Sequence, residues 1–157
     1  MSKTTPATLA LAKSGIAFSL AHYAYDPDAQ RVGLQAAEAM GVSPAEVFKT
    51  LMAELDGKPV CAIVPSDKEV NMKKLAAALG GKSASMMKPA DAERLTGYKV
   101  GGISPLGQRK QVPTALDELA TLYDEIFLNG GQRGLQIRIR PADLFQVLGC
   151  VVADLVR

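Results

Sequence analysis

Lys49 is the residue with the clearest potential for chemistry, because it stands in an otherwise apolar segment. The segment Val47-Phe48-Lys49-Thr50-Leu51 is typical of a β-strand, on which Lys49 shares a face with Val47 and Leu51. Both faces are largely apolar, so Lys49 is expected in a buried or cleft-lining position. An ammonium group is costly there unless an anion binds it. The alternative is a lysine that reaches solvent at a sheet edge and blocks aggregation.

A glycine-rich loop between residues 97 and 107 is the second candidate. Gly101-Gly102 lets the backbone approach a ligand closely and present its N–H groups without a side chain in the way. Such donors can hold a phosphate or polarise a carbonyl. Ser104-Pro105 adds a hydroxyl and a stiff turn. An ordinary surface turn is the alternative, and hairpin chemistry explains most of the similar segment 130–134.

Basic residues gather in the middle of the chain, although the net charge is only +2. Lys73 and Lys74 open an expected helix that Asn71 can cap, so a phosphate of RNA would suit both their charges and the helix N-terminus. A solvated helix face explains them equally well. Aromatic residues make up 5% of the chain, too few for the usual base-stacking platform.

Several common catalytic and cofactor motifs are missing from the sequence. A single histidine, His22, excludes a zinc site with several imidazole ligands, and no Cys-x-x-Cys pair, Walker loop or Gly-x-Gly-x-x-Gly motif is present. We expect no metal, no cofactor and no protein nucleophile of the usual kind, and we interpret His22 as a partly exposed residue at a strand end. Cys61 and Cys150 lie in apolar stretches, which is typical of buried, reduced cysteines in a cytoplasmic protein. No membrane span and no membrane partner are expected.

Helix and strand signals alternate along the 157 residues. Expected helices follow Thr5-Pro6 and cover residues 35–40, 72–79, 89–95 and 141–148, with one helical turn after Ser43. Expected strands cover residues 16–23, 47–55, 58–64, 85–88, 111–116, 124–128, 134–140 and 151–156, with hairpin turns at Asp56-Gly57 and Asn129-Gly130-Gly131. The chain is therefore expected to form one compact α+β domain, residues 1–157, with a mixed, mostly antiparallel sheet.

Three segments together resemble the YbaK/EbsC family. They are Val47-Phe48-Lys49-Thr50-Leu51, the run from Thr96 to Gly107, and Gly130-Gly131-Gln132-Arg133-Gly134-Leu135. The family is similar to the editing domain inserted in bacterial prolyl-tRNA synthetases and includes a Cys-tRNA(Pro) deacylase. The resemblance implies a barrel-like sheet surrounded by short helices, and a trans-editing deacylase that removes mischarged cysteine from Cys-tRNA(Pro), with Cys-tRNA(Cys) as a further candidate substrate. In such an enzyme, the thiol of the attached cysteine attacks its own ester carbonyl and leaves as a thiolactone.

The resemblance also implies roles for individual residues. Lys49 would contact the tRNA 3′ end, and the backbone of Gly101 would face the ester carbonyl, with Tyr23 as a pocket aromatic. The remaining implied substrate contacts are Gly102, Ile103, Ser104 and Gln136. The tRNA(Pro) acceptor end and prolyl-tRNA synthetase are the implied partners.

Two positions depart from the family pattern. Gln136 stands where an aspartate is found, and Val32 stands where an aromatic is found. The amino-acid specificity therefore stays open between cysteine and another residue such as alanine. A non-catalytic module that binds the tRNA acceptor end is the alternative from another class.

Overall fold

A long β-hairpin forms the centre of the computed structural model, which describes residues 4–27 and 32–157. Strand β2 (Phe48–Leu55) pairs antiparallel with β3 (Lys58–Pro65) through the predicted turn, where Asp56 and Gly57 both have positive φ. Strand β4 (Ala84–Met86) pairs with the second half of β2. Residues 48–51 of β2 therefore have no partner strand on that side among the described residues. This free edge becomes one wall of a cleft.

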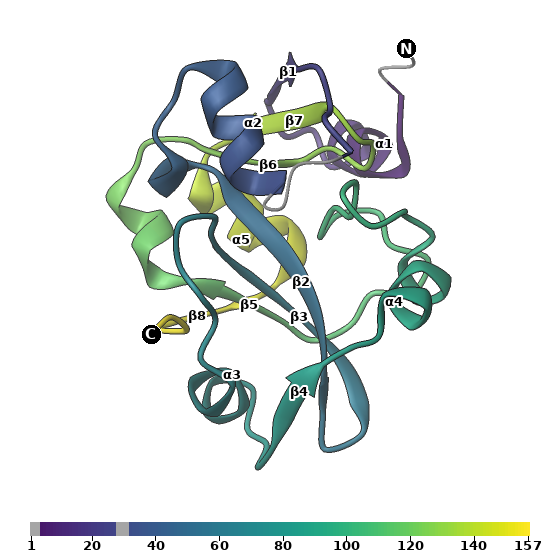
Figure 1. The fold of residues 1–157 in the computed structure, drawn as a ribbon, viewed down its shortest axis with the longest axis vertical. Helices are drawn as coiled ribbons and strands as arrows, with labels where there is room; N and C mark the ends of the chain where they lie inside the picture. The colour runs from purple at the N-terminus through teal and green to yellow at the C-terminus, as the bar shows by residue number, and fades with distance from the viewer. Residues whose placement is uncertain (1–3, 28–31) are drawn as a thin grey trace.

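Two parallel strands complete the sheet on its other side. Strand β5 (Thr114–Asp117) pairs with β3, and β8 (Val151–Ala153) pairs with β5, which gives the order β4-β2-β3-β5-β8. A second, antiparallel sheet has the order β1-β7-β6, from β1 (Ser19–His22), β7 (Leu135–Ile139) and β6 (Ile126–Asn129). Figure 1 shows this smaller sheet above the long hairpin. An isolated bridge between Val47 and Phe127 joins the two sheets.

The expected sheet arrangement needs one correction. The α+β class and the mixed, mostly antiparallel pairing are confirmed, but the described strands form two open sheets and no closed barrel. Among the described residues, the two sheets share a buried core but are joined as strands only by the isolated Val47–Phe127 bridge, and β4 and β8 remain edge strands.

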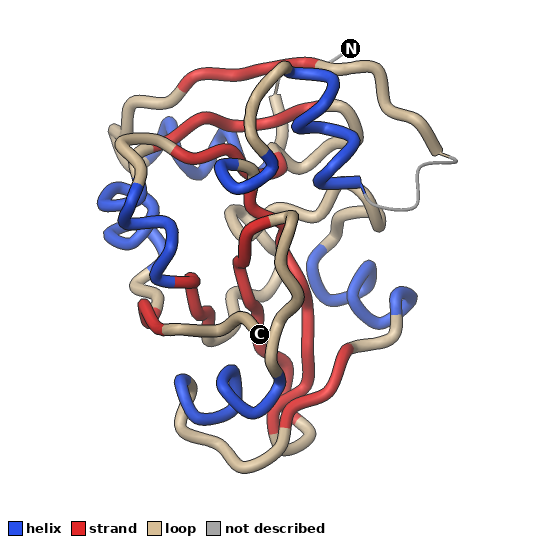
Figure 2. The backbone as a smooth tube through the Cα atoms, turned by 60° about the vertical axis from the view of Figure 1, so that its left-hand side comes forward, coloured by secondary structure: helices blue, strands red, loops and turns tan. Residues whose placement is uncertain are grey.

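Five α-helices and two short 3₁₀ turns surround the sheets within the described residues (Figure 2). The helices are α1 (Pro6–Lys13), α2 (Val32–Met40), α3 (Met72–Ala78), α4 (Pro89–Thr96) and α5 (Pro141–Leu148), and the turns are η1 (Pro44–Glu46) and η2 (Glu118–Leu122). Thr5 caps α1 and Asn71 caps α3, as predicted, because each side chain accepts hydrogen bonds from the first-turn N–H groups. No helix of the described chain is long and apolar enough to cross a bilayer.

Burial divides the apolar residues into three clusters. The largest packs α1 and α5 against strands of both sheets, with Leu11, Ile63 and Ile137 fully buried. A second lies beneath α3, around Leu75. A third places Tyr23 and Val47 under α2. Cys61 and Cys150 are buried and unpaired with each other, as predicted.

Element boundaries differ from the expectation where a local hydrogen bond competes with the strand. β1 is shorter than residues 16–23 because the N–H of Ile16 bonds back to the carbonyl of Leu11 at the end of α1. η2 was not expected. It forms because the Asp117 carboxylate accepts a hydrogen bond from the N–H of Leu119 and caps the turn.

Candidate functional site

A cleft of about 400 Å³ runs along the free edge of β2, where the two sheets meet. Its walls come from β2, from the segment between β4 and α4, from the glycine loop after α4, and from the ends of β6 and β7. The residues that line it are Val47, Phe48, Lys49, Thr50, Leu51, Met52, Ser66, Met86, Met87, Pro89, Ala92, Val100, Gly101, Ile103, Asn129 and Gln136. Segments far apart in the sequence therefore build one concave surface, which is the usual form of a small-molecule site.

Lys49 lies in this cleft, as expected from its apolar surroundings. Its side chain is 23% exposed, and Nζ is 4.0 Å from Oε1 of Glu69. Glu69 is 61% exposed and does not line the cleft. Lys49 thus keeps an ammonium group at a half-buried position where an anionic ligand would find little competing solvent.

Gly101 brings the backbone of the loop into the cleft. It has a φ of +89°, and a Cβ atom at this position would lie 2.8 Å from the Tyr25 hydroxyl. At the adjacent Gly102, a Cβ atom would lie 2.9 Å from the backbone nitrogen of Arg133. Gly101 is therefore favoured by its backbone conformation, and Gly102 is required because the backbone of Arg133 leaves no space for a Cβ atom. Gly101 and Ile103 line the cleft, whereas Gly102 is buried behind it.

Asn129 connects the glycine loop to the neighbouring hairpin. Its Nδ2 donates to the carbonyl of Gly101 at 3.2 Å, and its Oδ1 accepts from the N–H groups of Gly131 at 2.7 Å and Gln132 at 3.2 Å. We predicted only a turn at Asn129 from the sequence. Its position directly before two glycines was the one available signal, but the partner loop is 28 residues away.

Tyr25 and Arg133 lie beside Gly101, although neither lines the cleft. The Arg133 guanidinium lies 5.3 Å from the centre of the Tyr25 ring, and its Nε donates to the carbonyl of Val100 at 2.9 Å. This stacking and hydrogen bond hold the start of the glycine loop against the β6–β7 turn. Tyr25 was not among the residues predicted for the site.

Gln136 and Thr50 present polar atoms to the cleft from two different strands. Gln136 is 3% exposed, and the described structure gives neither its Oε1 nor the Thr50 hydroxyl a hydrogen-bond partner. Tyr23 lies behind the cleft and does not line it. Burial raises the pKa of the Tyr23 hydroxyl, which lies near Gln136 but makes no hydrogen bond of normal geometry with the described residues. Thr50 was missed because we assigned no role to the second face of the strand.

The other predicted positions lie outside the cleft. Ser104 is fully buried within its loop, where its hydroxyl accepts from the N–H of Leu106. Lys73 and Lys74 lie on α3, and Nζ of Lys74 bonds to Oδ2 of Asp154 at 2.7 Å and to the carbonyl of Val156 at 2.8 Å. Val32 begins α2, but its side chain lies outside the described part of the chain.

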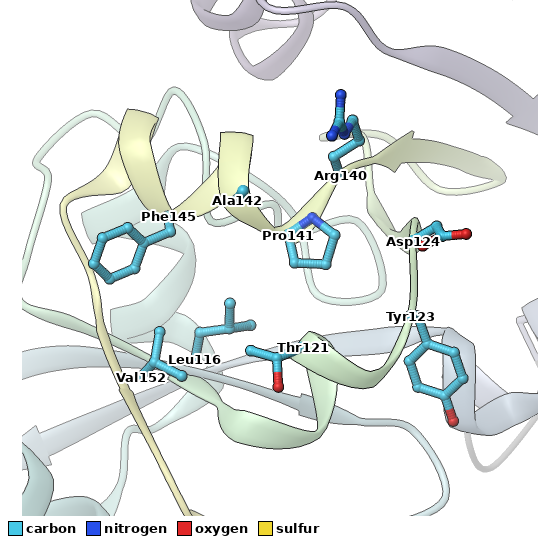
Figure 3. A pocket seen from close by; sticks show the side chains of 9 residues that line it. All are labelled: Leu116, Thr121, Tyr123, Asp124, Arg140, Pro141, Ala142, Phe145 and Val152. Atoms are coloured by element: carbon cyan, nitrogen blue, oxygen red, sulfur yellow. The ribbon is translucent and has the colours of Figure 1, made fainter.

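A second pocket of about 380 Å³ lies between η2, α5 and β8 and holds none of the predicted site residues (Figure 3). Leu116, Phe145 and Val152 lie toward one end of it, while Asp124 and Arg140 lie toward the other. It combines a partly exposed apolar surface with two charged side chains, and we assign it no chemistry.

The cleft can bind and orient a ligand without supplying a nucleophile of the usual kind. It offers one cation at Lys49, glycine backbone at residue 101 and neutral polar atoms at Thr50 and Gln136. The buried Cys61 thiol is outside it, and burial raises the pKa of this thiol to about 12. A protonated, inaccessible thiol is a poor nucleophile.

Comparisons of sequence and of structure both relate this chain to proteins of aminoacyl-tRNA editing. The model of the aminoacyl-tRNA editing domain family matches residues 26–147. EbsC of Enterococcus faecalis, named as an inferred Cys-tRNA(Pro)/Cys-tRNA(Cys) deacylase, is 38% identical over 120 residues, which cover 76% of this chain and 73% of that protein. The multifunctional Ser/Thr-tRNA deacylase ProXp-y of Escherichia coli is 28% identical over 115 residues, covering 70% and 69%. A crystal structure described as an inferred trans-editing enzyme for prolyl-tRNA synthetase superposes with a TM-score of 0.84 at 26% identity and covers 99% of both chains.

Proposed function

The chain belongs to the aminoacyl-tRNA editing domain family, and we propose that it removes mischarged cysteine from Cys-tRNA(Pro) as a trans-acting deacylase. The observation that carries this proposal is the convergence of Lys49, Gly101 and Gln136 on one cleft from three separate parts of the chain. The similarity to EbsC supports cysteine as the amino acid and Cys-tRNA(Cys) as a second substrate. Prolyl-tRNA synthetase is the partner that this function implies, because its pocket cannot strongly reject a substrate of nearly proline's size.

Lys49 and Gly101 divide the binding task in this proposal. The Lys49 ammonium pairs with a phosphate at the tRNA 3′ end, where its half-buried position strengthens the attraction. The backbone N–H of Gly101 faces the ester carbonyl and stabilises the negative charge that develops on its oxygen. Tyr23 stands behind Gln136 and shapes the wall beside the amino-acid side chain.

The substrate thiol then supplies the nucleophile that the cleft lacks. Its sulfur forms a bond to the ester carbonyl carbon, the ester C–O bond breaks, and the thiol proton ends on the ribose oxygen. The products are a cyclic thiolactone and deacylated tRNA. Holding the sulfur next to the carbonyl carbon lowers the activation free energy of this step substantially, since effective molarities reach about 10⁵–10⁸ M in well-oriented intramolecular reactions.

The contacts to the rest of the tRNA have two candidate surfaces. Lys73 and Lys74 on α3 remain the predicted one, with Lys74 also engaged by Asp154. Lys88, Lys99 and Arg133 are exposed and adjoin residues that line the cleft. The second surface would allow the acceptor stem to approach while its 3′ end enters the cleft.

Single-turnover deacylation tests the proposed function. Excess protein is mixed with tRNA(Pro) charged with cysteine, alanine, serine or proline, and the surviving ester is followed over time. We expect loss of the cysteine ester alone, because serine and alanine lack a thiol. Lys49→Ala should slow this loss by about 100-fold or more, as expected when a charged contact to the reacting substrate is removed. Lys58→Ala, at the other end of the same hairpin, is the matched control and should keep the wild-type rate.

Three other results of this assay would contradict parts of the proposal. Loss of alanine or serine instead of cysteine would assign a different ester and end the thiolactone mechanism. Wild-type turnover by Lys49→Ala would remove Lys49 from the site. Survival of every ester, with tRNA still bound, would support a non-catalytic acceptor-end binding module.

A further inference from the structure

We infer that the cleft recognises the α-nitrogen of its substrate as a neutral hydrogen-bond donor, and that it therefore also accepts aminoacyl esters whose amine is acylated. The inference rests on the proposed function and widens its substrate class. It follows from the charges that line the cleft, from two unpartnered polar atoms and from the adaptable apolar wall.

None of the described residues that line the cleft is a carboxylate that would pair with an ammonium. Among the described residues that line it, Lys49 is the only charged one, and none is Asp or Glu. Glu69 approaches Nζ of Lys49 to 4.0 Å but lies outside the lining. Tyr23, behind Gln136, stays neutral because burial raises the pKa of its hydroxyl. A substrate ammonium would thus lose water and meet a like charge, and both effects favour the uncharged form of the nitrogen.

Two buried polar atoms provide hydrogen bonds in place of a counter-ion. Gln136 Oε1 and Thr50 Oγ1 both belong to cleft-lining side chains and have no hydrogen-bond partner among the described residues. A buried acceptor without a partner is costly, so a ligand that donates an N–H to it gains affinity. The N–H of an amide meets this need as well as that of a neutral amine. The Gln136 side chain stays uncharged whichever way its amide is turned.

The wall of the cleft can adapt to an added acyl group. Met52, Met86 and Met87 line it together, and unbranched thioether side chains fill irregular space and repack readily. Its volume of about 400 Å³ lies in the range of pockets that hold small ligands. An acetyl group on the α-nitrogen therefore faces flexible apolar side chains rather than a fixed polar wall.

Deacylation of paired esters tests the inference. Excess wild-type protein is mixed with Cys-tRNA(Pro) or with N-acetyl-Cys-tRNA(Pro), and the protein-free loss of each ester is subtracted. We expect the two rate constants to agree within about threefold, because the neutral amine and the amide both carry an N–H for the unpartnered acceptors and neither requires a counter-ion. Gln136→Glu should favour the free amine by about tenfold or more, because a carboxylate within reach stabilises an ammonium. Gln111→Glu makes the same change at an exposed position and should keep the wild-type ratio.

The wild-type comparison decides the inference even if Gln136→Glu fails to fold. Loss of Cys-tRNA(Pro) with survival of the N-acetyl ester would overturn the inference and leave the proposed function standing. Survival of both esters would overturn the proposed function, and the inference with it. An unchanged ratio in folded Gln136→Glu would show that residue 136 does not face the α-nitrogen, and would also count against the inference.

Discussion

Gly101 combines two demands that a side chain cannot meet together. Its backbone has a φ of +89°, and the space beside its Cα is taken by the Tyr25 hydroxyl. In Gly101→Ala the left-handed conformation costs about 1–2 kcal/mol, and the new methyl group must push the Tyr25 hydroxyl away from the glycine loop. We expect the rate constant for cysteine release to fall by about 100-fold, since small displacements of a substrate-binding group are costly to catalysis. Single-turnover deacylation measures it.

Gly41 provides the matched control for this substitution. It also has a positive φ, +71°, but nothing lies within 4 Å of the position where its Cβ would stand. Gly41→Ala should lower the free energy of unfolding by a similar amount and leave the rate constant unchanged. If the two variants lost activity equally, backbone strain rather than crowding of the cleft would explain the effect.

The alternation of side chains along a strand predicts the surroundings of a single residue, but not its contacts to distant loops. It placed Lys49 between apolar neighbours, and the structure puts this side chain in the cleft. Alternation says nothing about which loop faces a strand edge, so Asn129 and Tyr25 were not found. Their roles depend on contacts to Gly101 across 28 and 76 positions of the chain, and such contacts leave no local pattern.

Asn129 acts between elements, because three backbone groups from two loops depend on its side chain. Asn129→Ala leaves the carbonyl of Gly101 and the N–H groups of Gly131 and Gln132 without this partner. Each unsatisfied buried group costs about 1–3 kcal/mol where water cannot replace the partner. We expect a lower free energy of unfolding in urea and, separately, a lower kcat/KM for deacylation, because Gly101 is no longer held.

Asn71→Ala separates these two effects. Asn71 accepts from two N–H groups at the start of α3, and loss of such a cap costs about 1 kcal/mol. Asn71 does not line the cleft, so this variant should lose stability and keep its kcat, whereas KM can change because α3 carries Lys73 and Lys74. If Asn129→Ala and Asn71→Ala lost the same activity for the same loss in free energy of unfolding, Asn129 would have no positioning role.

The elements that the sequence predicted correctly are those whose signals are local. The Asp56-Gly57 turn, the Thr5 cap and the proline at the start of α5 each act within a few residues. The pairing of β3 with β5 joins residues more than fifty positions apart, and the split into two sheets depends on such pairings. Local signals therefore could not show that the described strands form two open sheets and no closed barrel.

At the scale of the whole molecule, the buried core sets how stability responds to pH. Cys61 is fully buried on β3, and burial raises the pKa of its thiol from 9.0 to about 12. Burial likewise raises the pKa of the Tyr98 hydroxyl from 10.0 to about 12. Both groups are neutral when protonated, so the folded chain keeps its protons at a pH where the unfolded chain has released them.

The sign of the effect follows from proton counting. Between pH 9 and 12 the unfolded state binds fewer protons at Cys61 than the folded state, so the free energy of unfolding falls as pH rises. One group contributes at most about 1.4 kcal/mol per pH unit, and Tyr98 adds to the fall above pH 10. Below pH 9 neither group should make stability depend on pH.

Urea unfolding at pH 7, 9, 10 and 11 tests this prediction with Cys61→Ala beside the wild type. The variant lacks the thiol, so its stability should fall less steeply above pH 9, and the difference between the two proteins should shrink as pH rises. Cys61→Ala should also keep its deacylation rate at pH 7, because the thiol lies outside the cleft. Parallel stability curves over the whole range would mean that the Cys61 thiol titrates normally in the folded state, and hence that β3 does not shield it from water.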